Sequence, residues 1–212
     1  MSQLTLSSID SSLVEEISSK RNEPDWLKEY RKNSLSIYHD LPAEVSPLYN
    51  KYTDARRMNP EQVSLSTSSD SSVPDFLTKR LDEIKNEISI VQIGSNIYSI
   101  NVNDELKSKG LVISSLDDAL QNHSELIQKT LEDSNSKEDK YTALNNAAFN
   151  SGIFVYIPQN LTVDKPIHLV SCLSLDGIST ISRNMIIAEK NTQVSVVQEL
   201  YAPKASKQQA YL

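Results

Sequence analysis

The chain has 212 residues and a formal net charge of −7, which argues against nucleic-acid binding because phosphate contacts need clustered lysine and arginine. It contains no apolar stretch near the roughly 20 residues of a membrane-spanning helix, and no signal-peptide core at its N-terminus. Its single cysteine, Cys172, cannot form an intramolecular disulfide, so we expect a cytoplasmic protein without a membrane partner.

Two helices and a polar linker are expected first. Ser12 and Glu15 have the spacing of a capping box and predict a helix that ends near Ser19. Pro24 predicts the start of a second helix, because proline fits the first helical turn. Its apolar face comprises Trp26, Leu27, Tyr30, Ile37 and Tyr38. Residues 41–60 are expected to form an extended connector, and residues 64–72, with six serines, a linker. Residues 1–73 are therefore one N-terminal region.

Helices and strands are expected to mix between residues 74 and 140. One helix is predicted after Pro74 by four apolar residues at helical spacing, Leu77, Leu81, Ile84 and Ile88. A hairpin of residues 91–93 and 97–100 follows, with Gly94-Ser95-Asn96 as its turn, and then a strand at 111–113. Ser115 is expected to cap one further helix, and Asp118 stands in the capping-box position. The apolar face of that helix comprises Leu116, Leu120, Leu126, Ile127 and Leu131.

The last part, residues 141–212, is predicted to begin with a helix and to continue as short strands. Tyr141, Leu144 and Ala148 share one helix face, and Gly152 is expected to cap that helix. Strands are predicted at 153–157, 167–170, 172–175, 185–188 and 194–197, with corners at Asn160, 164–166, 176–177 and 189–191. Short strands separated by tight corners favour a β-solenoid. The predicted fold class is thus mixed α and β, with helices leading into a mostly β core.

Several motifs occur in order along the chain. Ala143-Leu144-Asn145 is followed by the pattern G-x-F-V-Y-I-P at 152–158 and by V-x-x-P-I at 163–167. This run resembles the SufB/SufD family, the scaffold subunits of the SUF iron–sulfur cluster assembly machine. Further matching residues are Ile17, Ser18, Lys20, Glu23, Pro24, Trp26 and Leu27, then Ala119, Leu120, His123, Glu125 and Leu126 with residues 110–113, and finally residues 183–189.

The resemblance implies a fold and a role. It implies the start of a right-handed β-helix and a scaffold subunit that pairs with a SufB-type or identical subunit and with the SufC ATPase. Family members normally continue with more coils and a C-terminal helical region, so we expect the chain to be an N-terminal portion. The nature of the partner subunit, the place where a cluster forms and the packing of residues 1–73 on the core stay open.

One departure from the family pattern concerns a cysteine. SufB-type members read E-G-C-T-A-P where this chain reads Gln198-Glu199-Leu200-Tyr201-Ala202-Pro203. Leu200 stands in the place of a cysteine associated with nascent clusters, and leucine cannot ligate iron. The chain therefore resembles SufD more than SufB. Metal ligands are unknown, and Cys172, which lies outside the motif, is the one candidate.

The remaining functional hypotheses depend on a few reactive residues. His168 and Cys172, four residues apart, would share one face of a strand and could form a nucleophile pair, although packed solenoid positions are the commoner explanation. No catalytic set and no Gly-rich phosphate loop are present in the sequence, so we expect a protein that is not an enzyme. The alternatives are an iron–sulfur cluster carrier that uses Cys172, and a β-solenoid carbohydrate-active enzyme.

Overall fold

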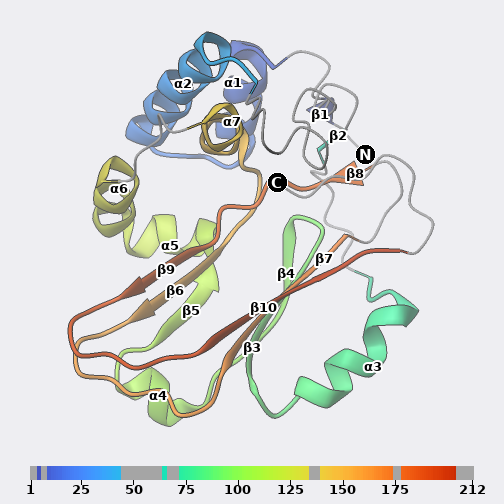
Figure 1. Cartoon of the computed structure of the whole chain (residues 1–212), viewed down its shortest axis with the longest axis vertical. Coiled ribbons are helices and arrows are strands. Elements are labelled where there is room, and N and C mark those ends of the chain that lie inside the picture. Colours follow the sequence, from blue (N-terminus) through green and yellow to red (C-terminus); the bar gives the residue numbers. More distant parts are fainter. Residues whose placement is uncertain are drawn as a thin grey trace, which may run out of the picture.

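Helices lead into three β sheets in the computed structural model, which describes residues 4–5, 9–43, 64–65, 72–133, 139–173 and 178–203. In Figure 1, the helices α1, α2 and α7 lie together at one end of the molecule, and α3 lies apart from them beside the long strands. The expected mixed α and β class is confirmed. Within the described ranges, no helix is long and apolar enough to cross a membrane.

Helix α1 spans Ser11–Lys20, as expected, but a different residue caps it. The Asp10 carboxylate accepts hydrogen bonds from the backbone N–H of Ser12 at 2.9 Å and of Leu13 at 3.4 Å. The predicted Ser12 cap is therefore wrong, because Asp10 already satisfies the free N–H groups of the first turn. Ser12 lies inside the helix instead.

Helix α2 spans Asp25–Asp40 and contains a fully buried arginine that the apolar pattern did not predict. Arg31 makes a two-pronged ion pair with Glu23, at 2.8 Å from Nε and 2.7 Å from Nη2. Its Nη1 donates to the carbonyl of Ala147 at 3.1 Å, and its guanidinium lies 3.7 Å from the ring centroid of Phe149. Trp26 Nε1 also donates to Ser124 Oγ at 3.1 Å. The described N-terminal helices thus pack on the core, which answers one question that the sequence left open.

Helix α3 spans Asp75–Ile84 and is shorter than predicted. Ile88 lies in strand β3, Ile88–Ile93, where it pairs with Ile167, so its placement on the helix was wrong. The hairpin of β3 with β4, Asn96–Asn101, is confirmed, and Gly94 takes the positive φ of 59° that its turn requires. A short helix α4, Asp104–Ser108, was not predicted.

The expected cap at Ser115 is confirmed, while the helix behind it is two helices. Ser115 Oγ accepts from the backbone N–H of Asp118 at 3.0 Å, at the junction of strand β5, Val112–Ser115, and helix α5, Leu116–Asn122. At His123 the backbone leaves the helical region, and α6, Ser124–Asp133, starts in a new direction. The imidazole of His123 stacks on the ring of Phe154, with 5.6 Å between centroids.

Gly152 has a different role from the predicted helix cap. Helix α7, Lys140–Ala148, already ends with Phe149 as its C-cap. A Cβ at position 152 would lie 2.2 Å from the carbonyl oxygen of Arg183 and 3.0 Å from a methyl group of Leu116. Glycine is needed here because the backbone of a later segment passes directly against it.

The remaining strands follow the predicted order with shifted bounds. They are β6 Ile153–Ile157, β7 Ile167–Cys172, β8 Ile178–Ser179, β9 Met185–Ala188 and β10 Val196–Tyr201. The strand predicted at 172–175 does not begin separately, since β7 runs through Cys172, and its residues 174–175 lie outside the described residues. Strand β10 starts two residues later than expected. The corner predicted at 176–177 and most of the connector at 41–60 lie outside the described residues. The linker prediction at 64–72 fails at its start, because Ser64–Leu65 forms strand β2.

The described strands form three sheets that share one pattern of pairing, antiparallel at one edge and parallel at the other. Sheet A is β1 (Leu4–Thr5)-β2-β8, sheet B is β10-β7-β3-β4, and sheet C is β5-β6-β9. In each sheet one edge strand, β1, β4 or β5, pairs antiparallel, and the strands at the other edge, β8, β10 and β9, pair parallel. We call the free sides of β8, β9 and β10 the stacking edge. The chain visits sheets C, B, A, C and B in turn from β6 to β10.

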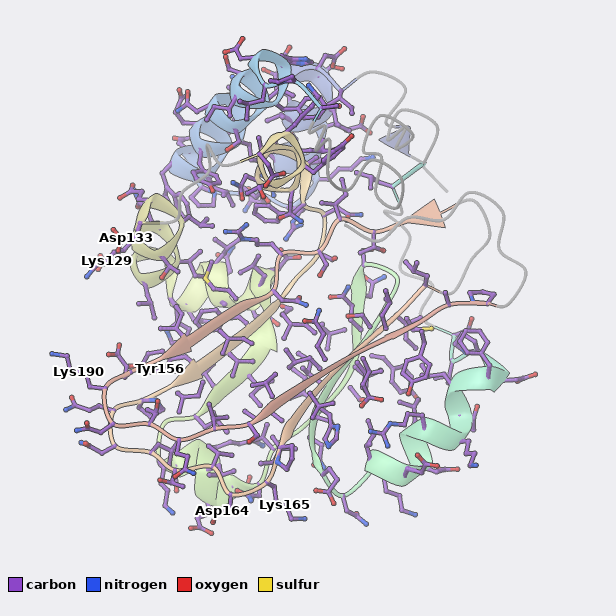
Figure 2. All side chains as sticks on the ribbon, in the orientation of Figure 1. Lys129, Asp133, Tyr156, Asp164, Lys165 and Lys190 are labelled. Atoms are coloured by element: carbon purple, nitrogen blue, oxygen red, sulfur yellow. The ribbon has the colours of Figure 1, made fainter. Side chains whose placement is uncertain are left out.

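Successive parallel strands are related by a nearly constant offset. Phe154 pairs with Met185, 31 residues later, and Ile167 pairs with Val196, 29 residues later. The corners repeat as well: Asn160 and Asn191 both have positive φ, and the side chain of Asn191 donates to that of Asn160 at 3.1 Å. In Figure 2, the corner residues Asp164, Lys165 and Lys190 point away from the sheets. The corners predicted at Asn160 and 189–191 are confirmed, and the right-handed β-helix stays a prediction.

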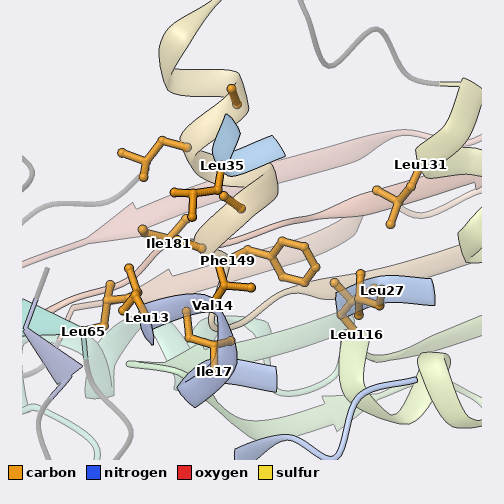
Figure 3. Packing of buried hydrophobic residues seen from close by; sticks show 14 of the residues in the cluster. Leu13, Val14, Ile17, Leu27, Leu35, Leu65, Leu116, Leu131, Phe149 and Ile181 are labelled. Carbon is orange, nitrogen blue, oxygen red and sulfur yellow. The ribbon is translucent and has the colours of Figure 1, made fainter. Parts of the chain in front are cut away.

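Three apolar clusters hold these layers together. The largest joins the helices to the outer face of sheet C, and Phe149 lies at its centre among Val14, Leu27 and Leu35 (Figure 3). The second fills the space between sheets B and C. Its members include Ile88, Ile90, Ile113, Ile153, Val155, Ile157, Ile167 and Leu169. The third lies under α3, on the other face of sheet B.

A polar clamp fastens α3 across sheet B. Arg80 of α3 makes a two-pronged ion pair with Glu199 of β10, at 2.8 and 2.7 Å. The hydroxyl of Tyr201 donates to Glu199 at 2.8 Å, and His168 Nδ1 lies 3.2 Å from the same carboxylate. The hydrogen bond from Arg80 lowers the pKa of Glu199 to about 2. The outermost strand of sheet B is thereby tied to a helix that precedes it by more than a hundred residues.

We predict that Gly152→Ala destabilises the chain by about 1–3 kcal/mol, because the added methyl group overlaps the Arg183 carbonyl. Urea unfolding followed by circular dichroism measures the change. Gly94→Asn is the matched control, since position 94 is open and asparagine tolerates positive φ. Equal stability of Gly152→Ala and the parent chain would contradict the proposed close approach.

We predict that Glu199→Gln lowers stability at neutral pH by about 1–3 kcal/mol, because Arg80 loses a charged partner. The Glu199 pKa is lowered on folding, so its contribution is present above the ordinary value near 4.5 and is lost as the pH falls towards 2. The difference between parent and variant in urea midpoint should therefore shrink over this window. Glu105→Gln, in an exposed pair with Lys109, serves as the control. A difference that did not change with pH would refute this assignment.

Candidate functional site

Cys172 lies at the end of β7, in the apolar cluster under α3. Its side chain is 2% exposed and is surrounded by Val91, Ile93, Val170 and Leu77, among others. Burial raises the pKa of the thiol to about 11. A protonated, enclosed thiol is a poor nucleophile and a poor metal ligand at neutral pH. The geometry therefore favours a packing role for the one cysteine.

His168 and Cys172 do share one face of β7, as the alternation of a strand requires. Four residues of strand nevertheless separate their Cα atoms by roughly 13 Å. The imidazole of His168 is engaged elsewhere, because its Nδ1 lies 3.2 Å from Glu199 and 3.4 Å from Arg80 Nη2. The structure does not bring the two residues together as a nucleophile pair.

The other histidines lie in structural surroundings. His39 contacts the ring of Tyr38 edge-on at 5.3 Å, and His123 stacks on Phe154. Among the residues that the structure describes, no group of three or more histidine, cysteine, aspartate or glutamate side chains could hold a metal ion. The chemistry of a cluster ligand set is therefore not assembled within the described ranges.

Leu200, where the sequence motif leads us to expect a cysteine, lies in β10 at the stacking edge. It pairs with Ser171, which pairs in turn with Gln92, so the three residues form one row across sheet B. Val196 packs on the cluster between sheets B and C, and alternation along β10 places Leu200 on that same inner face. The Leu200 side chain is 53% exposed because no described strand lies beyond β10. The Leu200 side chain therefore faces the core between sheets B and C but is left partly exposed at the edge of the sheet.

The stacking edge carries further exposed apolar side chains. Ile186 of β9 is 45% exposed and pairs with Val155, a residue of the cluster between sheets B and C. Val197 of β10 is 38% exposed on the opposite face, which α3 covers further along. Among the described strands, sheets B and C thus both end at this edge, with apolar side chains exposed and no further strand paired. Such an edge is a ready template for another strand.

A hollow with a volume of about 560 Å³ opens beside β9. Its wall consists of Thr130, Asp139, Tyr141, Thr142, Asn145 and residues 182–186. Two polar groups of the wall are hydrogen-bonded within the fold: Asn145 Nδ2 donates to the Ser182 carbonyl at 3.1 Å, and Arg183 Nη1 donates to Asn146 Oδ1 at 2.8 Å. These hydrogen bonds hold the wall of the hollow in place beside β9.

Sequence reasoning missed the residues that organise this edge. Arg80 and Glu199 are 119 residues apart, and no local pattern could pair them. The exposed Ile186 belongs to a strand that was predicted, but its position at an edge follows only from the order of the sheets. The one usable signal was the repeat of short strands, which predicted stacking in general.

Comparison with known proteins identifies the family. The model of the SufBD protein N-terminal region matches residues 20–169. A protein of Staphylococcus aureus described as an iron–sulfur cluster assembly SufBD family protein is 27% identical over 208 residues, which cover 90% of this chain and 43% of the relative. The iron–sulfur cluster assembly protein SufD of Bacillus subtilis is 30% identical over 197 residues, covering 90% and 45%.

These matches agree with the resemblance seen in the sequence motifs. The chain spans less than half the length of the curated relatives that it matches. The family model, by contrast, covers well over half of the chain and includes α2, sheet B up to Leu169 and most of sheet C. The chain therefore belongs to the SufBD family and contains the N-terminal region of that family.

Proposed function

We propose that the chain is the N-terminal part of a scaffold subunit in iron–sulfur cluster assembly and is not itself an enzyme. The observation that carries this proposal is the family match over residues 20–169, together with relatives that are described as iron–sulfur cluster assembly proteins. The buried thiol of Cys172 and the leucine at position 200 favour a structural role for the chain over direct ligation of a cluster. We place this role in the cytoplasm.

The proposal includes a right-handed β-helix that begins with β6. The parallel pairings with offsets of 29 and 31 residues support it, because stacked coils of a solenoid repeat in this way. Another coil that paired with β9 and β10 would cover Ile186 and Leu200 and extend the core between sheets B and C. Burial of each such side chain contributes about 1.5–3 kcal/mol.

The proposed partners are a SufB-type or identical subunit and a SufC-type ATPase. The chain has no Gly-rich phosphate loop, so ATP hydrolysis would take place in the partner. Hydrolysis there would rearrange the scaffold where a cluster is built. A scaffold suits this task because closely packed layers, with α3 tied to sheet B by the Arg80–Glu199 clamp, would transmit a displacement without local collapse.

We predict that the complete gene product carrying this chain co-purifies with a SufB-type and a SufC-type subunit as one heteromeric assembly. Affinity pull-down followed by native mass spectrometry measures its composition. The 212-residue chain alone should retain little or no SufC-type subunit. A complete product that stayed alone with both subunits present would overturn the scaffold proposal.

We predict that Cys172→Ala does not reduce the iron that the chain binds after anaerobic reconstitution with iron and sulfide. The reason is that a thiol with a pKa of about 11, buried under α3, is not available as a ligand. Iron content and visible absorbance check this, and a thiol reagent should modify Cys172 slowly until the chain is unfolded. Cluster absorbance that vanished in Cys172→Ala, with unchanged circular dichroism, would instead establish a carrier role.

A further inference from the structure

Strand β4 forms the edge of sheet B that lies opposite the stacking edge. It pairs with β3 on one side, and no described strand lies on its other side. Tyr98 is 47% exposed and Ile100 is 43% exposed, and Ser99 and Asn101 are exposed as well. β4 therefore offers six residues of backbone with two large apolar side chains beside them.

The composition of this strand is unusual for an exposed edge. Edge strands commonly carry lysine, other charges or proline, which prevent pairing with another chain. Residues 88–103 contain no charged residue at all, although 23% of the chain is charged. The one protective feature is a bulge opposite Val91 and Gln92, where Tyr98 is the extra residue of β4. The bulge adds local twist at Tyr98, in the middle of β4, and the strand carries no charge or proline.

The sequence of β4 is close to a palindrome. Asn96-Ile97-Tyr98-Ser99-Ile100-Asn101 reads almost the same in both directions. In an antiparallel pair centred between Tyr98 and Ser99, each asparagine would face an asparagine and each isoleucine an isoleucine, while Tyr98 would face Ser99. A twofold interface requires such self-complementarity, because each copy presents the same surface.

The lack of charge on β4 also bears on its occupant. The chain carries a net charge of −7, so two copies repel each other across most of their surfaces. An uncharged strand reduces that repulsion locally and offers no counter-charge to a basic or acidic peptide. The best match for β4 is therefore another neutral edge of the same sequence.

We propose that β4 pairs antiparallel with β4 of a second copy of this chain. A six-residue edge buries less than the roughly 1,000 Å² of a stable interface, so the association is weak and depends on concentration. This surface is separate from the stacking edge, and the proposal does not rest on the scaffold role. It holds for the chain with or without the partner subunits.

The test is the association constant of the 212-residue chain, measured by sedimentation velocity from about 10 µM to 1 mM. The parent chain should pass from monomer towards dimer across this range. Tyr98→Lys should lower the association constant at least about tenfold, because it places one lysine from each copy close to the twofold axis, where the two positive charges repel. Phe76→Lys is the matched control: Phe76 is also an aromatic residue, 45% exposed, but lies on α3, and its replacement should leave the association unchanged.

The register supplies a second arm of the experiment. Tyr98 faces Ser99 of the second copy in the proposed pair, so a mixture of Tyr98→Lys chains and Ser99→Glu chains should associate again, while each variant alone stays monomeric. Thermal unfolding of every variant verifies that it is folded. A parent chain that remained monomeric at all concentrations would overturn the proposal. So would association that survived Tyr98→Lys but was lost in Leu200→Lys, since that result would place the contact at the stacking edge.

Discussion

The carbonyl oxygen of Arg183 passes so close to residue 152 that only glycine leaves room for it. This contact fixes the distance between two successive turns of the chain, because the segments on either side of it pair in parallel as β6 and β9. The same spacing recurs at the corners, where Asn160 and Asn191 share a hydrogen bond and a left-handed backbone. Without that register, the two apolar faces of sheet C could not meet the helices on one side and sheet B on the other.

The buried Arg31 belongs to the same constraint. It lies between Glu23 and the ring of Phe149, and Phe149 ends the helix that leads into Gly152. A buried charge is costly unless it is fully paired, and here two carboxylate oxygens, a backbone carbonyl and an aromatic face satisfy the guanidinium. The pair therefore fixes where the N-terminal helices sit more than it adds stability, because any shift of α2 would leave a charge in the core without a partner.

Local chemistry in the sequence predicted local structure well. The hairpin turn at Gly94, the cap at Ser115 and the corners at Asn160 and Asn191 each depend on a few neighbouring residues, and each is confirmed. Predictions failed where a distant segment decided the outcome. Ile88 continued the helical spacing of α3, but its pairing with β7 placed it in a strand.

The candidate site shows the same division. The strands that form the stacking edge could be predicted one by one, whereas their exposure could not, because it follows from the order of sheets that distant segments build. Arg80 and Glu199 illustrate this limit, since a two-pronged ion pair across 119 residues leaves no mark in local composition. The sequence predicts a helix cap at Gly152, and only the approach of Arg183 explains why this residue must be glycine.

The antiparallel strands β1, β4 and β5 make the two edges of the described sheets different. Each ends a sheet on one side, so parallel stacking can proceed only from β8, β9 and β10. The two ends also differ in chemistry: β9 and β10 expose side chains that belong to an inner core, whereas β4 exposes a neutral strand whose own core lies behind it. Coverage of the stacking edge would therefore extend one continuous core, whereas the proposed contact at β4 would join two surfaces that each already have a core behind them. Because each added coil would bury further apolar area at the stacking edge and none would at β4, the proposed contact at the stacking edge would be the stronger of the two.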